Sequence, residues 1–367
     1  MTRQELTAYI ESILPADREA MDAARQRQTE LATPPGSLGA LEDMSIRLAG
    51  IRRTPRPRND RCRVTVLAAD NGVVAEGVSC APQSVTVQQA VNKTRHKTGM
   101  SALAAYFGAQ VQVVDVGICV PVSCPQVLDR KVRFSTGDIA AEPAMTEQEA
   151  LRALSVGLDL AHMAKEEGID AVGVGEMGIG NTTTSAAVLA ALPGASVEEV
   201  AGRGGGLTDR GFATKKRVLR QALALHHPDP GDPVAVLAAV GGLELDAMTG
   251  LYLGCAHEGL AAAVDGYISI VAALCAVRLC PRVRDYLFLS HASYEIGYRL
   301  AARELELEPC LLLGMRLGEG SGCPLLFRIL QGACAVLNGM ATFPEAAIED
   351  KYLTPIRLGD AFTVDKS

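Results

Sequence analysis

Short runs of aliphatic and β-branched residues alternate with helical patterns along most of the chain. Helical periodicity covers, for example, residues 101–107 and 182–192. Strands that alternate with helices are typical of a parallel sheet covered by helices on both faces. The pattern therefore predicts an α/β protein with a doubly wound, mostly parallel, Rossmann-like sheet. The expected strands are 63–69, 110–116, 169–174, 259–264, 285–290 and 310–315.

The N-terminal region has a helical pattern without such strands. Helices are expected over residues 3–14, from about 17 to 32 and from about 37 to 51. The second ends at Pro34 and Pro35, because proline cannot continue a helix. The segment after about Ala341 is polar, and we expect it to pack on these helices. We therefore predict a small helical domain from residues 1–60 and 341–367, and a large α/β domain from residues 61–340.

Polar residues stand directly after several expected strands. In open α/β sheets, ligands bind beyond the carboxyl ends of the strands, so these side chains are the first candidates for a site. They are Asp70, Asp115, Glu176, Ser290 and Glu319.

Glu319 is the most distinctive of these acids, because it lies between Gly318 and Gly320 in the stretch RLGEGSGCP. A carboxylate in a glycine turn at the end of a strand projects toward the ligand crevice. Its apolar neighbours, such as Met315 and Leu317, suit it to accept a proton near neutral pH. The same stretch read alone also fits a solvated acid in a surface turn.

The stretch GVGEMG, residues 173–178, matches the dinucleotide-binding pattern G-x-G-x-x-G. No apolar strand follows at the distance that a Rossmann unit needs, so a dinucleotide-dependent oxidoreductase is the weaker interpretation. An anion site is the stronger one, because main-chain N–H groups at a helix start can hold a phosphate. An ordinary helix cap is the alternative. The residues concerned are Gly178, Gly180, Asn181 and Thr182.

A second glycine cluster, GRGGG, contains Gly204 and is followed by Lys215. Glycines allow close approach of the main chain to a ligand, and a lysine downstream would neutralise an anion. A surface loop with solvated lysines is the alternative interpretation. The hydroxyl of Ser290 is suited to bind a phosphate or a sugar. No G-x-S-x-G elbow and no H-x-H or H-x-x-x-H pair occur, so neither a serine hydrolase nor a zinc site is expected.

Composition excludes several classes of protein. The net charge is −7, which argues against binding nucleic acid, since that function requires clustered Lys and Arg. No apolar run is long enough to predict a membrane span. The ten cysteines include no C-x-x-C pair, and we expect reduced thiols in a cytoplasmic protein.

Taken together, the stretches resemble one family, the nicotinate-nucleotide–dimethylbenzimidazole phosphoribosyltransferases of cobalamin biosynthesis. The matching stretches follow one another in order along most of the chain. They are PPGSLGALE (34–42), AADNGVVAEGVS (68–79), VTVQQAVN (85–92), VDVGI (114–118), GVGEMGIGNTTTSAA (173–187), VGGLELDAMTG (240–250), LSHASYEIG (289–297) and RLGEGSGCPL (316–325).

The resemblance implies a homodimeric pentosyltransferase that needs no metal or other cofactor. Its substrates would be nicotinate mononucleotide and 5,6-dimethylbenzimidazole, and its products α-ribazole 5′-phosphate and nicotinate, with inversion at the anomeric carbon. It also implies roles for single residues. Glu319 would be the general base, and Glu176 and Lys215 a charged pair that contacts substrate. The phosphate would be held by Gly178, Gly180, Asn181 and Thr182, with Gly204 and Ser290 as further contacts. Gln89 would be part of the benzimidazole pocket, and Leu317 and Gly318 would also bind substrate.

Two positions depart from the family pattern. Asn71 stands where the family commonly has histidine, so no histidine role is assigned there. The mouth of the expected base pocket reads Ser79-Cys80-Ala81, where relatives vary. One alternative is therefore the same transfer to adenine or a phenolic base. The alternative from a different class is the dinucleotide-dependent oxidoreductase, which rests on GVGEMG.

Overall fold

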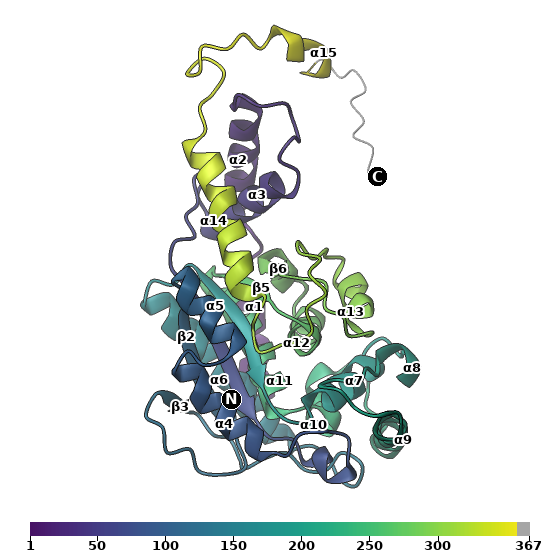
Figure 1. Cartoon of the computed structure of the whole chain (residues 1–367). Coiled ribbons are helices and arrows are strands. Elements are labelled where there is room, and N and C mark those ends of the chain that lie inside the picture. The colour runs from purple at the N-terminus through teal and green to yellow at the C-terminus, as the bar shows by residue number, and fades with distance from the viewer. Residues whose placement is uncertain (358–367) are drawn as a thin grey trace. The chain divides into compact units, whose positions relative to one another are not determined.

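The computed structural model describes residues 1–357, which form two compact units (Figure 1). The larger unit comprises residues 1–15 and 59–328, and the smaller comprises residues 16–58 and 329–357. The boundaries between these units differ from those expected from the sequence, near the N-terminus and near the C-terminus. Residues 1–15 belong to the larger unit, and residues 329–340 to the smaller one.

The larger unit is built on a six-stranded parallel sheet with the order β3-β2-β1-β4-β5-β6. The order reverses between β1 and β4, which is the switch point where open α/β sheets bind ligands. The expected doubly wound fold is confirmed. The strands are β1 (Cys62–Ala69), β2 (Gln110–Gly117), β3 (Val127–Asp129), β4 (Ala171–Met177), β5 (Ala261–Val264) and β6 (Leu287–Leu289).

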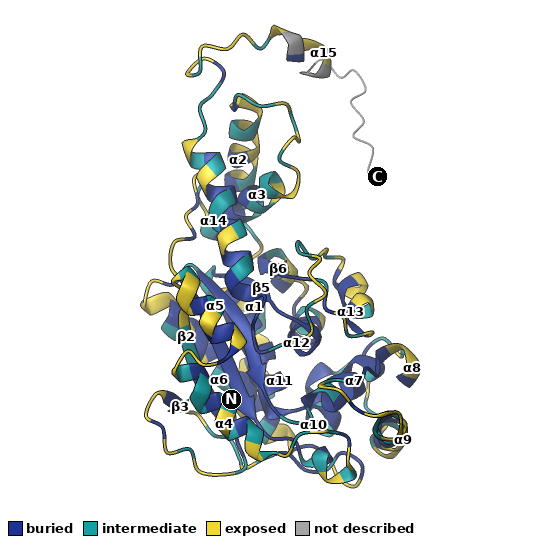
Figure 2. Cartoon of the chain, viewed as in Figure 1, coloured by how far each residue is buried: buried dark blue, intermediate teal, exposed yellow. Residues whose placement is uncertain are grey.

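The central strands consist almost entirely of buried residues, since helices cover both faces of the sheet (Figure 2). Helices α4 (Ser84–Thr94) and α5 (Gly99–Phe107) lie against one face, and α11 (Leu243–Glu258) packs against the other. The other helices of this unit are α1 (Arg3–Ser12), α6 (Glu147–Glu166), α7 (Asn181–Ala191), α8 (Val197–Val200), α9 (Asp209–His226), α10 (Pro233–Val240), α12 (Tyr267–Leu279) and α13 (Tyr298–Leu305).

The smaller unit consists of α2 (Arg18–Glu30), α3 (Ala40–Arg52), the later turns of α14 (Cys323–Gly339) and α15 (Thr354–Arg357). Its core is formed by Ala24, Ile46, Ala49 and Leu337, with Met21 packed against them. The chain after α14 returns to the helices as expected. The N–H of Phe343 donates to the carbonyl of Glu30 at 3.1 Å, and the N–H of Ala32 donates to that of Ala341 at 3.0 Å.

One expected strand is wrong, and one strand was not expected. The run 310–315 forms only an isolated bridge between Leu311 and His291. Leu312 and Leu313 are 84% and 57% exposed, so the run lacks the burial that its apolar residues suggested. Strand β3 has only three residues and too little apolar pattern to be recognised.

Candidate active site

A cavity of about 240 Å³ opens at the carboxyl end of β4, inside the larger unit. Most residues singled out in the sequence line it: Gln89, Glu176, Gly178, Asn181, Thr182, Gly204, Leu317, Gly318 and Glu319. Its remaining lining residues are Val85, Met177, Ile179, Gly205, Tyr267, Ile268, Ser293, Glu295 and Arg316. Segments separated by more than 200 residues therefore meet at the switch point of the sheet.

Glu319 occupies a strained main-chain conformation. Its φ angle is 64°, and the flanking Gly318 and Gly320 have φ angles of 75° and 87°. For a residue with a side chain, the left-handed region costs about 1–2 kcal/mol. Such outliers persist only where the surroundings hold them in place, and they are frequent at functional sites.

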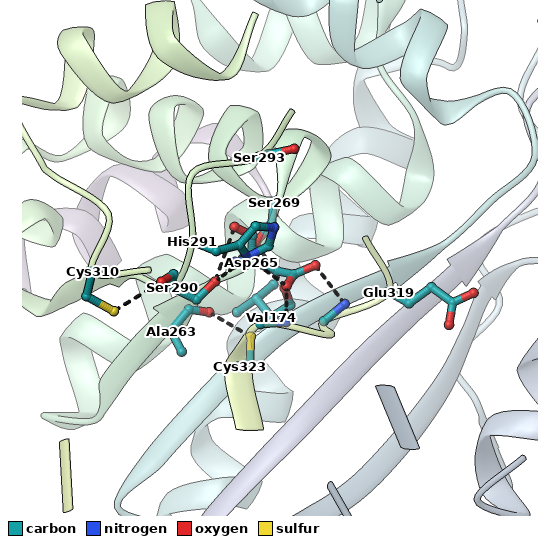
Figure 3. A network of polar contacts seen from close by, with 12 residues as sticks. Val174, Ala263, Asp265, Ser269, Ser290, His291, Ser293, Cys310, Glu319 and Cys323 are labelled. Atoms are coloured by element: carbon teal, nitrogen blue, oxygen red, sulfur yellow. Dashed lines mark hydrogen bonds and ion pairs between the residues drawn. The ribbon is translucent and has the colours of Figure 1, made fainter. Parts of the chain in front are cut away.

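Two buried acids, Glu176 and Asp265, accept hydrogen bonds from the main chain of this turn, and Figure 3 shows the contacts of Asp265. The N–H of Glu319 donates to Glu176 Oε1 at 2.9 Å. The N–H groups of Gly320 and Gly322 donate to the two carboxylate oxygens of Asp265, at 2.9 and 2.6 Å. Since Glu176 is in β4 and Asp265 directly follows β5, neighbouring strands fix the turn to the edge of the sheet. The Glu319 side chain points away from the Asp265 network.

The glycines of GVGEMG make room for the same turn. A Cβ atom at Gly175 would lie 2.6 Å from the carbonyl oxygen of Glu319, and one at Gly173 would lie 2.5 Å from Cβ of Cys323. The glycines thus allow β4 to be packed closely by the chain that carries Glu319. That packing accounts for the match to the dinucleotide pattern without a dinucleotide.

Glu176 is buried between several partners. Its Oε2 accepts a 2.5 Å hydrogen bond from the side-chain amide of Asn181. Burial raises the pKa of Glu176, and the nearby charge of Glu319 adds to this effect. The hydrogen bonds and the charge of Lys93 act in the opposite direction.

Lys93 is the residue that the sequence reasoning missed most clearly. Its Nζ lies 3.1 Å from Glu319 Oε2, and its side chain is fully buried. Burial lowers the pKa of Lys93, whereas Glu319 and Glu176 raise it. A signal was present, because Val85, Gln89 and Lys93 follow one another at four-residue spacing and share one face of α4.

The start of α7 forms the other end of the cavity, and Lys215 contacts it from outside the lining. Lys215 is fully buried and donates a 2.8 Å hydrogen bond to the hydroxyl of Thr182, in the first turn of α7. Burial lowers the pKa of Lys215 to about 8. Gly180 precedes the helix with a φ angle of 95° and caps it without a side chain. The arrangement of a cation beside a helix start is suited to bind an anion.

Some of the expected residues lie outside the lining. Lys215 contacts Thr182 rather than Glu176, so these two residues do not form an ion pair with each other. Ser290 is fully buried behind the turn, with its Oγ 3.0 Å from Nδ1 of His291 and 3.4 Å from the carbonyl of Asp265 (Figure 3). Ser293 lines the cavity instead.

Asp265 was also missed, although the rule that selected Glu176 applied to it. It follows β5 directly, as Asp70 follows β1. Burial raises the pKa of Asp265 to about 7, and the N–H groups of Gly322 and Gly320 oppose this.

Within residues 1–357, no cluster of three or more His, Cys, Asp or Glu side chains is arranged to hold a metal ion. The helices in this range also include none with the length and apolar character to cross a membrane. All ten cysteines are free thiols.

Comparison with known proteins identifies the family. A family model described as phosphoribosyltransferase matches residues 13–348. The nicotinate-nucleotide–dimethylbenzimidazole phosphoribosyltransferase of Clostridium perfringens is 44% identical over 98% of this chain and 99% of its own length. The enzyme of the same name from Chloroflexus aggregans is 45% identical over 94% of this chain and 98% of its own.

Solved structures agree with the sequence relatives. The nicotinate-nucleotide–dimethylbenzimidazole phosphoribosyltransferase of Thermus thermophilus superposes with a TM-score of 0.86 and 42% identity. The match covers 91% of this chain and 99% of that one. Fold, order of the matching stretches and coverage lead to one assignment: the chain belongs to the nicotinate-nucleotide–dimethylbenzimidazole phosphoribosyltransferase family.

Proposed function

We propose that this protein transfers phosphoribose from nicotinate mononucleotide to 5,6-dimethylbenzimidazole, giving α-ribazole 5′-phosphate and nicotinate. The observation that carries the proposal is the placement of Glu319. Its side chain lines the cavity at the switch point of the sheet, with Lys93 beside its carboxylate, and Glu176 accepts the main-chain N–H of the same residue. The transfer requires a base at such a place, because the incoming azole must lose a proton.

In this reaction, one ring nitrogen of dimethylbenzimidazole attacks the anomeric carbon of the nucleotide. The bond from that carbon to the pyridinium nitrogen breaks, and its electron pair neutralises the departing nicotinate ring. The proton on the other azole nitrogen passes to Glu319. A positioned base of this kind contributes about 10²–10⁴-fold to the rate. Attack from the face opposite the leaving group inverts the anomeric carbon.

The phosphate of the nucleotide would bind at the start of α7. Two observations support this placement. Lys215 contacts Thr182, and Thr182 and Gly204 both line this end of the cavity. A Cβ atom at Gly204 would lie 2.8 Å from the Thr182 hydroxyl, so the two segments are in close contact. Holding both substrates against one carbon supplies much of the remaining rate by proximity.

The acceptor base would lie between α4 and the turn that carries Glu319. Val85, Gln89 and Leu317 line this part of the cavity, and the apolar side chains of Val85 and Leu317 suit a flat, mostly apolar ring. The same geometry would accept adenine or a phenol. A competition assay among these bases therefore decides which acceptor the protein prefers. Homodimer formation and a cytoplasmic location belong to this proposal as well, and sedimentation equilibrium tests the first.

The test is a competition assay with nicotinate mononucleotide and a mixture of dimethylbenzimidazole, adenine and phenol, with products identified by mass. We expect α-ribazole phosphate as the main product. Glu319→Gln should bind the nucleotide normally and turn over about 10²–10⁴-fold more slowly. Release of nicotinate without any ribosylated base, or near-normal turnover by the Gln variant, would contradict the proposal.

A further inference from the structure

Lys93 is a charged side chain in a place where charges are costly. It is fully buried on α4, and its Nζ lies 3.1 Å from Glu319 Oε2 and 3.5 Å from the sulfur of Met177. A buried ammonium is stable only when opposite charges and hydrogen bonds replace the water that it has lost. The position of Lys93 therefore depends on the acids of the candidate active site.

Lys93 lies beside two neighbouring acids. The side chain of Glu176 in β4 accepts the main-chain N–H of Glu319, and the charge of Glu319 acts on Glu176. Neighbouring carboxylates disfavour each other's ionised form, whereas an ammonium within about 4–6 Å favours it. Lys93 is charge-coupled to both acids, with Glu319 the stronger partner.

Other acids near α4 are engaged elsewhere. The elements that pack on this helix are β1, β2, β3, β4 and α5. Asp70, after β1, accepts the hydroxyl of Thr86 and the N–H of Cys119. Asp115 of β2 pairs with Lys131, Asp129 of β3 accepts the N–H of Lys131, and α5 carries no acid. The acids facing Lys93 are thus Glu176 of β4 and Glu319.

The two oxygens of Glu319 have different surroundings. Oε2 is buried against Lys93 and accepts no well-aligned hydrogen bond from the described residues. The side chain as a whole is 12% exposed and lines the cavity. The carboxylate therefore has one buried face, toward Lys93, and one face toward the space for substrate.

We propose that Lys93 is a positioning residue for the proton acceptor. Its ammonium pairs with Oε2 of Glu319 beside Glu176, so that the remaining oxygen is available to receive the azole proton. During transfer the azole N–H bond breaks and a Glu319 O–H bond forms, while Lys93 keeps its own three protons throughout. This inference rests on the proposed phosphoribosyl transfer and deepens it.

The test compares the pH dependence of kcat/KM for dimethylbenzimidazole in the wild type and in K93M. Methionine retains most of the length and apolar volume of lysine but has no charge. We expect the acid limb to move up by about 1–3 pH units, with the rate recovering at alkaline pH. The KM for nicotinate mononucleotide should stay near that of the wild type. K97M removes an exposed lysine just after α4 and should leave the profile unchanged.

Two further variants keep the inference falsifiable. K93Q is neutral but polar, and it should give the same shift if K93M folds poorly. In the E319Q background, adding K93M should cost no further turnover, because a residue that acts through Glu319 has nothing left to act on. Three results would overturn the inference. The acid limb of the K93M profile could stay in place or move to lower pH, kcat/KM could fall equally at every pH, or the double variant could turn over more slowly than E319Q alone. Absence of nicotinate release by the wild type would instead contradict the proposed function itself.

Discussion

The main-chain N–H of Glu319 donates a 2.9 Å hydrogen bond to the carboxylate of Glu176, so a second acid holds the candidate base in place. This contact joins residues 143 positions apart and links the last glycine turn of the sheet unit to β4. It makes the geometry of the base depend on a residue that need not itself exchange a proton.

Glu176→Ala and Glu176→Gln should therefore differ. Alanine removes the acceptor for Glu319 and Asn181, and leaving a buried donor without a partner costs about 1–3 kcal/mol. Glutamine retains an acceptor oxygen for the Glu319 N–H. We expect the alanine variant to lose more turnover and more thermal stability than the glutamine variant. Equal effects in both assays would show that the hydrogen bond does not hold the turn.

Gly320→Ala should also destabilise this turn, through main-chain strain and a steric clash rather than a lost hydrogen bond. The position has a φ angle of 87°, and an added Cβ would lie 2.7 Å from a methyl carbon of Val64. Left-handed backbone alone costs about 1–2 kcal/mol for alanine. We expect a lower melting temperature and slower turnover, measured by calorimetry and by nicotinate release.

Gly332→Ala is the matched control for that variant. Gly332 is in α14, and a Cβ there meets no atom within 4 Å. Alanine is favoured over glycine inside a helix by about 1 kcal/mol. The control should be as stable as the wild type or more stable. A destabilised control would mean that any added methyl group harms this protein.

Lys215→Met should weaken binding of nicotinate mononucleotide. Hydrogen bonds to charged groups contribute about 1.5–3 kcal/mol, so KM should rise about 10- to 150-fold. The pKa of Lys215 is lowered to about 8, and the ammonium loses its charge as the pH rises through that value. The KM of the wild type should therefore increase above about pH 8, whereas that of the variant should change little.

Lys216→Met is the neighbouring control, because Lys216 lies over the ring of Phe212 rather than beside Thr182. We expect this variant to keep the KM of the wild type at pH 7. A matching rise in both variants would indicate a general effect of positive charge on α9 rather than a contact with phosphate.

Glu244→Gln should change how stability depends on pH. Burial raises the pKa of Glu244 to about 8 from an ordinary value of 4.5, and its Oε1 accepts the amide of Asn71. Between those two values the folded state binds more protons than the unfolded one, so stability falls as the pH rises. Glutamine does not ionise, so it removes this fall in stability with pH, and it keeps an acceptor oxygen for Asn71.

We expect the stability of the Glu244→Gln variant relative to the wild type to increase from pH 5 to pH 8. The gain should be on the order of a few kcal/mol, since one pKa unit corresponds to about 1.4 kcal/mol. Denaturant unfolding at several pH values measures it. A difference that is constant across this range would contradict the buried, protonated state of Glu244.

The sequence was most informative where an apolar run also fitted the rule that ligands bind at the carboxyl ends of parallel strands. Apolar runs predicted the parallel sheet, and the rule for strand ends selected Glu176, which the structure places in the cavity lining. Glu319 was selected by the same rule from the run 310–315, yet that run is largely exposed and forms no strand. Its glycine turn, rather than a strand, places Glu319.

Other features depend on contacts between distant segments and could not be predicted locally. The spacing in GVGEMG resembles a nucleotide loop, but Gly173 and Gly175 are needed because the turn before α14 packs on them. The sequence shows that Lys93 shares a face of α4 with Val85 and Gln89, but not that Glu319 lies 3.1 Å from its ammonium. In both cases the partner lies more than 140 residues further along the chain.

The shared face of α4 also bears on how such an enzyme can change. Val85 and Gln89 line the space for the acceptor, and Lys93, one turn further, contacts Glu319. A small rotation or shift of this helix would alter the shape of the acceptor space and the charge behind the base together. Substitutions that move α4 to reshape the acceptor space should therefore also change the pH dependence of the transfer, even where Lys93 itself is kept.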